Sequence, residues 1–512
     1  MTSLTSSIQK HCKGYISKAR LRRLHGIWFI GTLFLILWLF YAGDSNQISF
    51  EPSVLSKNEI QEIFVRTTGP RVVIFVMSNK IDNTLCYSVG SAYLSGFPIV
   101  VAGYQMEYKG FLSKFDFAES AMKNAQLNPE DIVILMDSDT VFTGVDIHPF
   151  LDHFIAQSAM APEELDALAV RQGRAMAPIV VSAEAGCWTP NLYVDNENCA
   201  IGYEAIHKKV RAYAAAHPEH KLPSFFDLSS QRYINAGVVI ARVWAYRELV
   251  QKADNLTKTQ PAKHKPEKGW HCDQSIFAAL YLDLLTWEVE RNIFSMQLHE
   301  RQAARSTYGV RAGFIGLDYA NELSAPRTNM YMHLTELQDK YWVKYLPQDE
   351  IGQTHSEMIN DINVAIRFVS DLYKRAYAAH GEEIYTRLAV PKWVNGKRTS
   401  GKTFISLTPP LLATELRSID VSNNNVRRTF PVIYHAAGTE AGYTKVGKLE
   451  HGAVGAPWLV PMVHNPKIEK QSMEYLVSIP LFLSTHNFII RDCFYTKCGF
   501  PFKRTIEKAQ SA

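Results

Sequence analysis

Residues 132–139 read IVILMDSD, and they predict the central strand of an α/β sheet. Five consecutive apolar residues are typical of a strand that is buried on both faces, as in a parallel sheet. Ligand sites of open α/β sheets lie at the carboxyl ends of strands, and this strand ends at Asp137 and Asp139. Side chains two residues apart on a strand share a face, so both acids can reach one cation. The pattern predicts a site for Mn²⁺ or Mg²⁺, which commonly hold substrate phosphates beside carboxylates.

Two acids at a strand end also fit a cap or a turn, so the interpretation depends on other parts of the chain.

The chain has 512 residues, which favours two to four domains. Its 47% hydrophobic and 20% charged residues are ordinary for a globular protein. The net charge is +4, and basic residues cluster before residue 24. Because the remainder is near neutral, we expect no nucleic-acid partner.

The N-terminal region predicts a single membrane-spanning helix. Residues 26–43 are uncharged and rich in Leu, Ile, Phe and Trp, and they are just long enough to cross a bilayer. The basic residues of segment 1–25 place that tail in the cytosol by the positive-inside rule. The short span suits the endoplasmic reticulum or Golgi membrane, with the cell surface as another location. The alternative is a signal peptide cleaved near Ala42, against which the long basic leader and long apolar run argue.

This orientation places six of the seven cysteines in the lumen, an oxidising compartment where disulfides form. The pairs Cys187 with Cys199 and Cys493 with Cys498 are locally plausible, although sequence does not determine connectivity. Asn255 begins a glycosylation sequon that the lumen would make usable. Residues 44–69 are polar and unpatterned, and we interpret them as a stem.

Alternating strands and helices then predict a Rossmann-like sheet over residues 70–340. A strand at 71–77 runs into Ser78, which suits a nucleotide or a simple turn. After a second strand at 99–102, Lys114 lies at the start of a helix, where it could meet a diphosphate or simply be solvated.

Later segments repeat the pattern of polar residues beside buried strands. The strand at 179–183 ends at Glu184, with Trp188 shortly after; together they suit an acceptor site, or a loop acid and a packing aromatic. Asn235 and Gly237 precede another apolar run, where Gly permits close approach of the backbone to a ligand. Asp273 opens an apolar helix through residue 285, as a functional acid or as a cap.

The pattern changes again towards the C-terminus. Residues 341–429 predict a mostly helical insert, within which 392–402 reads as a basic, solvated loop. Residues 430–512 close the domain: a strand runs into His435, and imidazole at a strand end makes metal ligation plausible beside the usual structural role. The apolar tail at 473–490 predicts core strands.

Five segments together resemble the glycosyltransferase domain of lysyl hydroxylases and procollagen galactosyltransferases, a domain shared with expression-site-associated trypanosome proteins. Two differences from the family pattern stand out. Only Ser138 separates the two acids, where the family often has two residues including an aromatic, and Val238 stands where a second Gly is usual. The segments are VILMDSDTVF (133–142), VVSAEAGCWTP (180–190), YINAGVVIA (233–241), CDQSIFAALYLD (272–283) and FPVIYHAAG (430–438) followed by Lys445.

The resemblance implies a GT-A-like, Rossmann-type mixed sheet that transfers a hexose from a nucleotide sugar, usually UDP-galactose or UDP-glucose. The acceptor would be a hydroxyl of a glycan or glycoprotein. The metal ligands would be Asp137, Asp139 and His435. Residues at the catalytic, donor-sugar and acceptor positions would be Glu184, Trp188, Asn235, Asp273 and Gln274. Taken with the strand-end and helix-start residues noted above, the candidates beside the nucleotide and cation are Ser78, Lys114, Asp137, Asp139, Gly237, Gly438 and Lys445.

Two other classes of function compete with this expectation. His271 and Asp273 match half of the facial triad of an iron oxygenase, but that enzyme needs a distal His and a series of alternating strands. A non-catalytic, membrane-anchored surface or receptor-like protein could also use a transferase fold. A decayed copy would be expected to have lost some of Asp137, Asp139, His435 and Asp273, all of which are present.

Overall fold

The computed structural model describes the greater part of residues 52–326 and shorter segments towards the C-terminus. The predicted membrane span 26–43 and the predicted site residues Trp188, Gly438 and Lys445 lie outside the described residues. None of the helices within the described ranges has both the length and the apolar character needed to cross a bilayer. The described ranges are 52–63, 69–95, 97–142, 147–184, 196–220, 233–262, 269–319, 322–326, 389–394, 397–402, 432–437, 470, 473, 476–477 and 479–499.

The fold is built on a nine-stranded mixed sheet in the order β1-β14-β13-β3-β2-β4-β7-β6-β8. Strand β4 (Ile132–Asp137) lies between β2 (Val72–Met77), which runs parallel to it, and β7 (Tyr233–Arg242), which runs antiparallel. The expectation of an α/β protein with a large mixed sheet is confirmed. The other strands are β1 (Ser53–Val54), β3 (Ile99–Ala102), β6 (Ile179–Glu184), β8 (Ile315–Asp318), β13 (Pro480–Ser484) and β14 (Ile489–Cys493).

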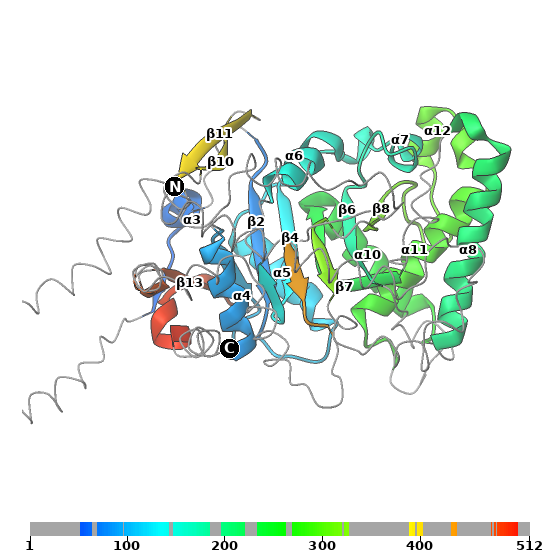
Figure 1. The fold of residues 1–512 in the computed structure, drawn as a ribbon. Helices are drawn as coiled ribbons and strands as arrows, with labels where there is room; N and C mark the ends of the chain where they lie inside the picture. The colour runs from blue at the N-terminus through cyan, green and yellow to red at the C-terminus, as the bar shows by residue number, and fades with distance from the viewer. Residues whose placement is uncertain are drawn as a thin grey trace, which may run out of the picture.

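Helices cover both faces of the sheet, which explains the unbroken apolar strands (Figure 1). Alternate residues of β2 show the two sides: Val73 and Phe75 belong to one core, and Ile74 and Val76 belong to the other. The first core packs against α5 (Ser113–Asn124), α8 (Asn196–Ala216), α10 (Val243–Thr259) and α11 (Asp273–Glu290). The second packs against α4 (Asn83–Leu94) and α6 (His148–Gln157).

A small three-stranded sheet lies beside the end of β4 and supplies the last predicted metal ligand. Its order is β5-β12-β9, and β5 follows β4 almost directly in the chain. Thr140 of β5 pairs with His435 of β12. The strands are β5 (Thr140–Phe142), β9 (Ser324–Pro326) and β12 (Ile433–His435). The remaining short helices are α3 (Lys57–Ile63), α7 (Ala167–Arg171) and α12 (Leu298–Ala303), with 3₁₀ turns at Pro162–Glu164, Pro218–His220 and Ile293–Ser295.

The predicted stem begins the folded domain instead of only leading to it. β1 pairs with β14 at the edge of the large sheet, and Leu55 and Ile60 are buried. Expecting residues 53–63 to be an unpatterned stem was therefore wrong. The reason is that their partner lies near the other end of the sequence, so no local periodicity shows the pairing. β13 and β14 confirm the core strands predicted within the tail.

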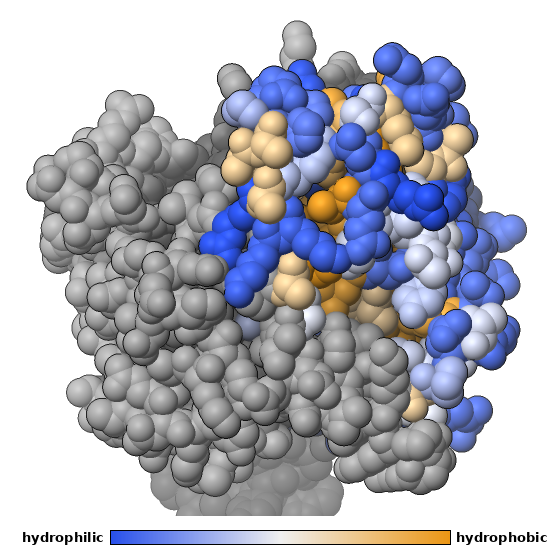
Figure 2. Space-filling model, turned by 90° about the vertical axis from the view of Figure 1, so that its right-hand side faces the viewer, coloured by the Kyte–Doolittle hydropathy of each residue, from blue (hydrophilic) through white to orange (hydrophobic). Residues whose placement is uncertain are grey.

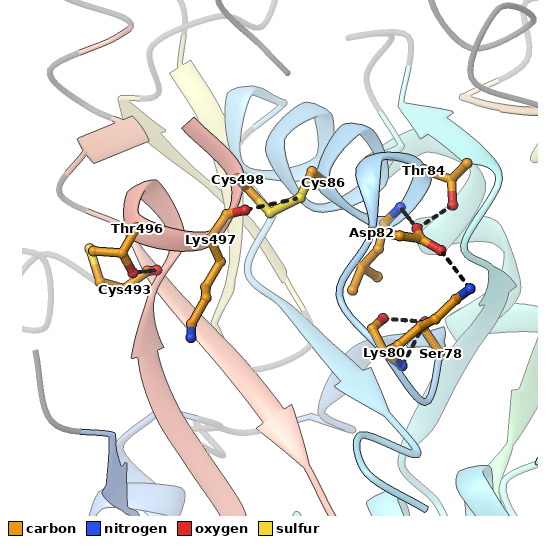
Figure 3. Close-up of a disulfide and its surroundings, with 10 residues drawn as sticks. Ser78, Lys80, Asp82, Thr84, Cys86, Cys493, Thr496, Lys497 and Cys498 are labelled. Carbon is orange, nitrogen blue, oxygen red and sulfur yellow. Dashed lines mark hydrogen bonds and ion pairs between the residues drawn. A yellow bond between two sulfur atoms is a disulfide. The ribbon is translucent and has the colours of Figure 1, made fainter. Parts of the chain in front are cut away.

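A disulfide joins Cys86 of α4 to Cys498, across 412 residues of sequence (Figure 3). The predicted pair of Cys493 with Cys498 is therefore wrong, and the Cys493 sulfur lies 3.7 Å from the carbonyl oxygen of Val477. Cys493 ends β14, whereas Cys498 is buried among the side chains that face α4, so the fold brings the distant cysteine closer than the local one. The predicted Cys187–Cys199 pair lies outside the described side chains.

Two strands lie within the predicted insert 341–429. β10 (Ala389–Val394) and β11 (Lys397–Lys402) pair antiparallel, from Ala389 with Lys402 to Val394 with Lys397. The prediction of a loop at 392–402 was wrong. Asn395-Gly396 stands between the two strands in the sequence, and Asn-Gly is a strong hairpin signal that composition alone conceals. The helical spacing predicted around residues 358–376 lies outside the described residues.

Candidate functional site

Asp137, Asp139 and His435 form a compact group at the carboxyl end of β4. Their ligand atoms lie within 4.8 Å of one another. The Nε2 atom of His435 is 3.4 Å from Oδ1 of Asp139 and 3.7 Å from Oδ2 of Asp137. Asp139 and His435 are 2% and 4% exposed, whereas Asp137 is half-buried. The sequence prediction that these three residues meet is confirmed.

The local fold explains how a residue three hundred positions away reaches β4. The Thr140 hydroxyl donates to the Asp137 carbonyl at 2.8 Å, which tightens the turn from β4 into β5. The backbone N–H of Ala436 donates to the Asp139 carbonyl at 2.8 Å, just after β12 has paired with β5. The same turn that carries the two acids therefore also docks His435.

Asn235 fixes the orientation of the His435 ring. Its Oδ1 accepts from the Gly237 N–H at 2.9 Å, which identifies this atom as the amide oxygen. An amide oxygen can only accept, so Nδ1 of His435 is the donor in the 2.9 Å bond between the two side chains. Nδ1 thus carries a proton, and Nε2 faces the two aspartates. Burial lowers the pKa of His435, but Asp139 and Asp137 outweigh this effect and the net pKa is raised. An oriented imidazole whose other nitrogen is held by an outer partner is the usual arrangement of a histidine ligand.

Gly237 has a more specific role than the predicted approach to a ligand. A Cβ atom built on Gly237 would lie 1.9 Å from Cε1 of His435, so any side chain there would collide with the imidazole. At Gly237 the backbone of β7 lies against the imidazole of His435, the predicted metal-binding side chain. Gly237 therefore makes room for the ring that Asn235 holds.

Glu184, Asn235 and Gln274 form a buried hydrogen-bonded group next to His435. The amide of Asn235 donates to one oxygen of Glu184 at 3.0 Å, and the amide of Gln274 donates to the other at 2.7 Å. Gln274 also accepts from the backbone N–H of Ala236 at 3.2 Å. Burial raises the pKa of Glu184 to about 8, although both amides and His435 act to lower it.

Lys114 connects two acids from different elements. Its Nζ lies 2.7 Å from Oδ1 of Asp137 and 3.0 Å from Oδ2 of Asp273. Burial lowers the pKa of Lys114, but the two carboxylates outweigh it and the pKa is raised. Burial raises the pKa of Asp273, Lys114 opposes this, and the net pKa is raised. Asp273 is also the first residue of α11, where a carboxylate interacts favourably with the helix dipole.

Ser78 does not point into this group. It follows β2, whose Met77 pairs with Asp137, but its hydroxyl donates to the carbonyl of Lys80 at 2.6 Å (Figure 3). The interpretation of Ser78 as a turn residue therefore agrees with the contact of its side chain.

Sequence reasoning missed Tyr246 on α10. Burial raises the pKa of Tyr246, and the nearby charge of Asp273 raises it further. A lone Tyr on an amphipathic helix carries no signal that would reveal this proximity.

The described residues include a second group with metal-ligand chemistry. His217, Glu219 and His220 follow the C-terminal end of α8 and also have ligand atoms within 4.8 Å of one another. Figure 2 shows the face of the molecule that carries α8. Hydrophilic side chains dominate its coloured part, around a smaller hydrophobic area. Unlike the group at β4, all three residues come from one short segment.

Comparison of the chain with models of known protein families and with curated proteins finds no match.

Proposed function

We propose that this protein is a divalent-metal-dependent glycosyltransferase with a GT-A-like fold, which moves a hexose from a nucleotide sugar to a hydroxyl. The observation that carries the proposal is the convergence of Asp137, Asp139 and His435 at the carboxyl end of β4. This is the end of the sheet where α/β proteins bind nucleotides. The strand order, with β7 antiparallel beside β4, supports the same proposal.

The residues present fit a hard or borderline divalent cation. Two carboxylates and one neutral imidazole nitrogen are suitable donors for Mn²⁺, and for Mg²⁺ with additional water. Asp273 adds a third carboxylate close by, against the single charge of Lys114. The excess of negative charge in a buried site favours a cation. When bound, the ion would neutralise negative charge on the departing nucleoside diphosphate.

The surrounding side chains suit the other tasks of the reaction. Lys114 is a fixed cation beside Asp137, where it can interact with a diphosphate oxygen. Both oxygens of Glu184 accept hydrogen bonds from amides, which hold the carboxyl in one orientation. Glu184 therefore fits a positioning role. Asp273 is the better candidate to accept the proton of the acceptor hydroxyl or to stabilise positive charge at the anomeric carbon.

The cellular setting follows from the sequence prediction of a type II membrane anchor. The disulfide between Cys86 and Cys498 supports an oxidising compartment such as the Golgi or endoplasmic reticulum lumen. A glycan or glycoprotein acceptor in that compartment completes the proposal. The donor we expect first is UDP-galactose or UDP-glucose.

The test is donor turnover by the purified full-length chain. The protein is incubated with Mn²⁺ and each common nucleotide sugar, with and without hydroxyl acceptors, and free nucleoside diphosphate is measured. We expect release from one donor, lost on chelation and in Asp139→Asn, but kept in Asp254→Asn, which changes an exposed acid on α10. Absence of turnover with every donor, from a folded protein that binds Mn²⁺, would contradict the proposal and favour the non-catalytic alternative.

A further inference from the structure

A surface cavity of about 510 Å³ lies far from the proposed active site. Its walls come from the loop before β4, from α10 and from residues 305–311. Pro129 and Trp244 mark its position: the backbone N–H of Trp244 donates to the Pro129 carbonyl at 2.9 Å, near the amino end of β4. Asp137 lies at the opposite end of that strand, about 20 Å away for a strand of this length. The cavity is therefore separate from the group around Asp137.

The lining of this cavity is strongly cationic. Four half-buried basic side chains line it, whereas Glu248 is its single acid. Glu248 is bound by Nε of Arg311 at 2.9 Å. Arg247 is paired with Glu119 at 3.2 Å, and Nη1 of Arg305 donates to two backbone carbonyls at 2.8 Å. Among the described residues, neither Lys252 nor Arg305 forms an ion pair with a carboxylate. The four cations are Arg247, Lys252, Arg305 and Arg311.

The backbone holds two of these cations side by side. Arg305 and Arg311 form an antiparallel bridge, closed by a turn in which the Ser306 N–H donates to the Val310 carbonyl at 2.8 Å. Like charges directly opposite each other on paired strands are destabilising. Burial lowers the pKa of Arg305, the charge of Arg311 lowers it further, and the charge of Glu248 opposes both effects without cancelling them. The single acid Glu248 faces both arginines, so an excess of positive charge remains that a bound anion would neutralise.

We propose that this cavity binds a tetrahedral oxyanion, a phosphate or sulfate group carried by a larger molecule. The planar guanidinium groups of Arg305 and Arg311 suit two oxygens of such a group, and Lys252 adds a point charge. The cavity is many times the volume of a water molecule, so it has room for the part that carries the group. Trp244 and exposed Pro129 offer apolar surface to that part. This inference is independent of the proposed transferase activity.

The experiment titrates full-length protein with inorganic phosphate and, separately, with sulfate, in chelator and at constant ionic strength set with chloride. Binding is measured by calorimetry and by the shift in melting temperature. We expect saturable binding that Lys252→Gln weakens about tenfold or more, because a charged hydrogen bond is lost. Lys258→Gln, on the last turn of the same helix and paired with Asp254, is the matched control and should bind as the unsubstituted protein.

The two arms identify the ligand class. Saturation by phosphate alone indicates a phosphate ester, and saturation by sulfate alone indicates a sulfate ester. Either of these two results supports the proposal. Arg305→Gln provides a second variant if Lys252→Gln does not fold. The proposal is overturned if the unsubstituted protein shows no saturable binding of either anion. It is equally overturned if folded Lys252→Gln or Arg305→Gln binds as tightly as Lys258→Gln.

Discussion

Two groups among the residues that the structure describes combine histidine with carboxylate side chains, yet they are built in different ways. Asp137 and Asp139 lie at the end of β4 and in the turn after it, whereas His435 lies on β12, far along the sequence. Asp139 and His435 are almost completely buried. The second group, at 217–220, lies in one exposed or half-buried segment after α8. Similar ligand chemistry thus occurs once as the product of the tertiary fold and once as a local sequence feature.

The surroundings of the two groups differ as well. In the first, Asn235 holds Nδ1 of His435 and leaves Nε2 facing the aspartates. In the second, the rings of His217 and His220 are stacked, with centroids 5.4 Å apart and planes 17° apart. A metal ion binds imidazole in the plane of the ring, and stacked rings do not share such a point. Proximity of ligand atoms is therefore insufficient, and we expect only the group at β4 to bind metal as built.

The largest expected effect is the loss of catalysis when an aspartate of the β4 group is changed. Asp139→Asn removes a buried anionic ligand while keeping the volume of the side chain. We expect Mn²⁺-dependent donor turnover to fall by about a hundredfold or more, because metal stabilisation of the leaving group contributes several kcal/mol. Rates of nucleoside diphosphate release check this. Turnover in Asp139→Asn within a few-fold of the unsubstituted protein would show that the metal is not held here.

A smaller effect is expected from the outer partners of the two groups. Asn235→Ala removes the acceptor that orients His435 and should weaken Mn²⁺ binding about 10- to 100-fold. Tyr213→Phe is the equivalent change in the second group, because the Tyr213 hydroxyl lies 2.8 Å from Nδ1 of His220. It should leave Mn²⁺ affinity unchanged. Equal effects of both changes in a Mn²⁺ titration would remove the distinction between the two groups.

The pH dependence of stability should have opposite signs for one glutamate near each group. Burial raises the pKa of Glu184 to about 8, from an ordinary value of 4.5. Its contribution to stability is thus fully present below pH 4.5 and is lost as the pH rises to about 8. The pKa of Glu219 is lowered, first by a hydrogen bond with its own backbone and further by His217 and His220. Its contribution is present above pH 4.5 and is lost as the pH falls below that value.

Urea unfolding between pH 3 and pH 9 measures these contributions as differences from the matched Gln variants. Glu184→Gln should lack the decline in stability between pH 4.5 and 8, relative to the unsubstituted protein. The stability of Glu219→Gln should differ from that of the unsubstituted protein in its pH dependence only below about pH 4.5. A free-energy difference for Glu184→Gln that does not change with pH would show that burial does not raise the pKa of Glu184 in the folded protein.

The smallest effect is expected for His217→Ala. The ring is partly exposed and its contacts lie within its own segment, so the change in unfolding free energy should be within about 0.5 kcal/mol. Thermal or urea unfolding checks this value, and Mn²⁺ affinity should be unaltered. A Mn²⁺-dependent stabilisation that His217→Ala abolishes would show that the exposed group binds metal after all.

The sequence allowed prediction of residues whose position depends on strands alone. Asp137 and Glu184 each end an apolar strand, and the rule that sites gather at strand ends brings them to the same edge of the sheet. The prediction could not include what depends on distant docking. Lys114 was expected to meet a diphosphate or solvent, and only the fold shows it between Asp137 and Asp273.

Corrections elsewhere in the fold have the same origin. Cys86 and Cys498 are 412 residues apart, and the pairing of β1 with β14 spans almost the whole domain. No local periodicity encodes such contacts, because they depend on how complete elements pack. The hairpin of β10 and β11 is different, since Asn395-Gly396 was a readable signal in the sequence.

The most direct test of the central claim is the stoichiometry of Mn²⁺ bound to the purified protein, measured by electron paramagnetic resonance of the free ion. The unsubstituted protein and Glu219→Gln should each bind one Mn²⁺ per chain, and Asp139→Asn should bind none in the same concentration range. One Mn²⁺ retained by Asp139→Asn and lost from Glu219→Gln would contradict the claim. Absence of Mn²⁺ binding to the unsubstituted protein would contradict it as well.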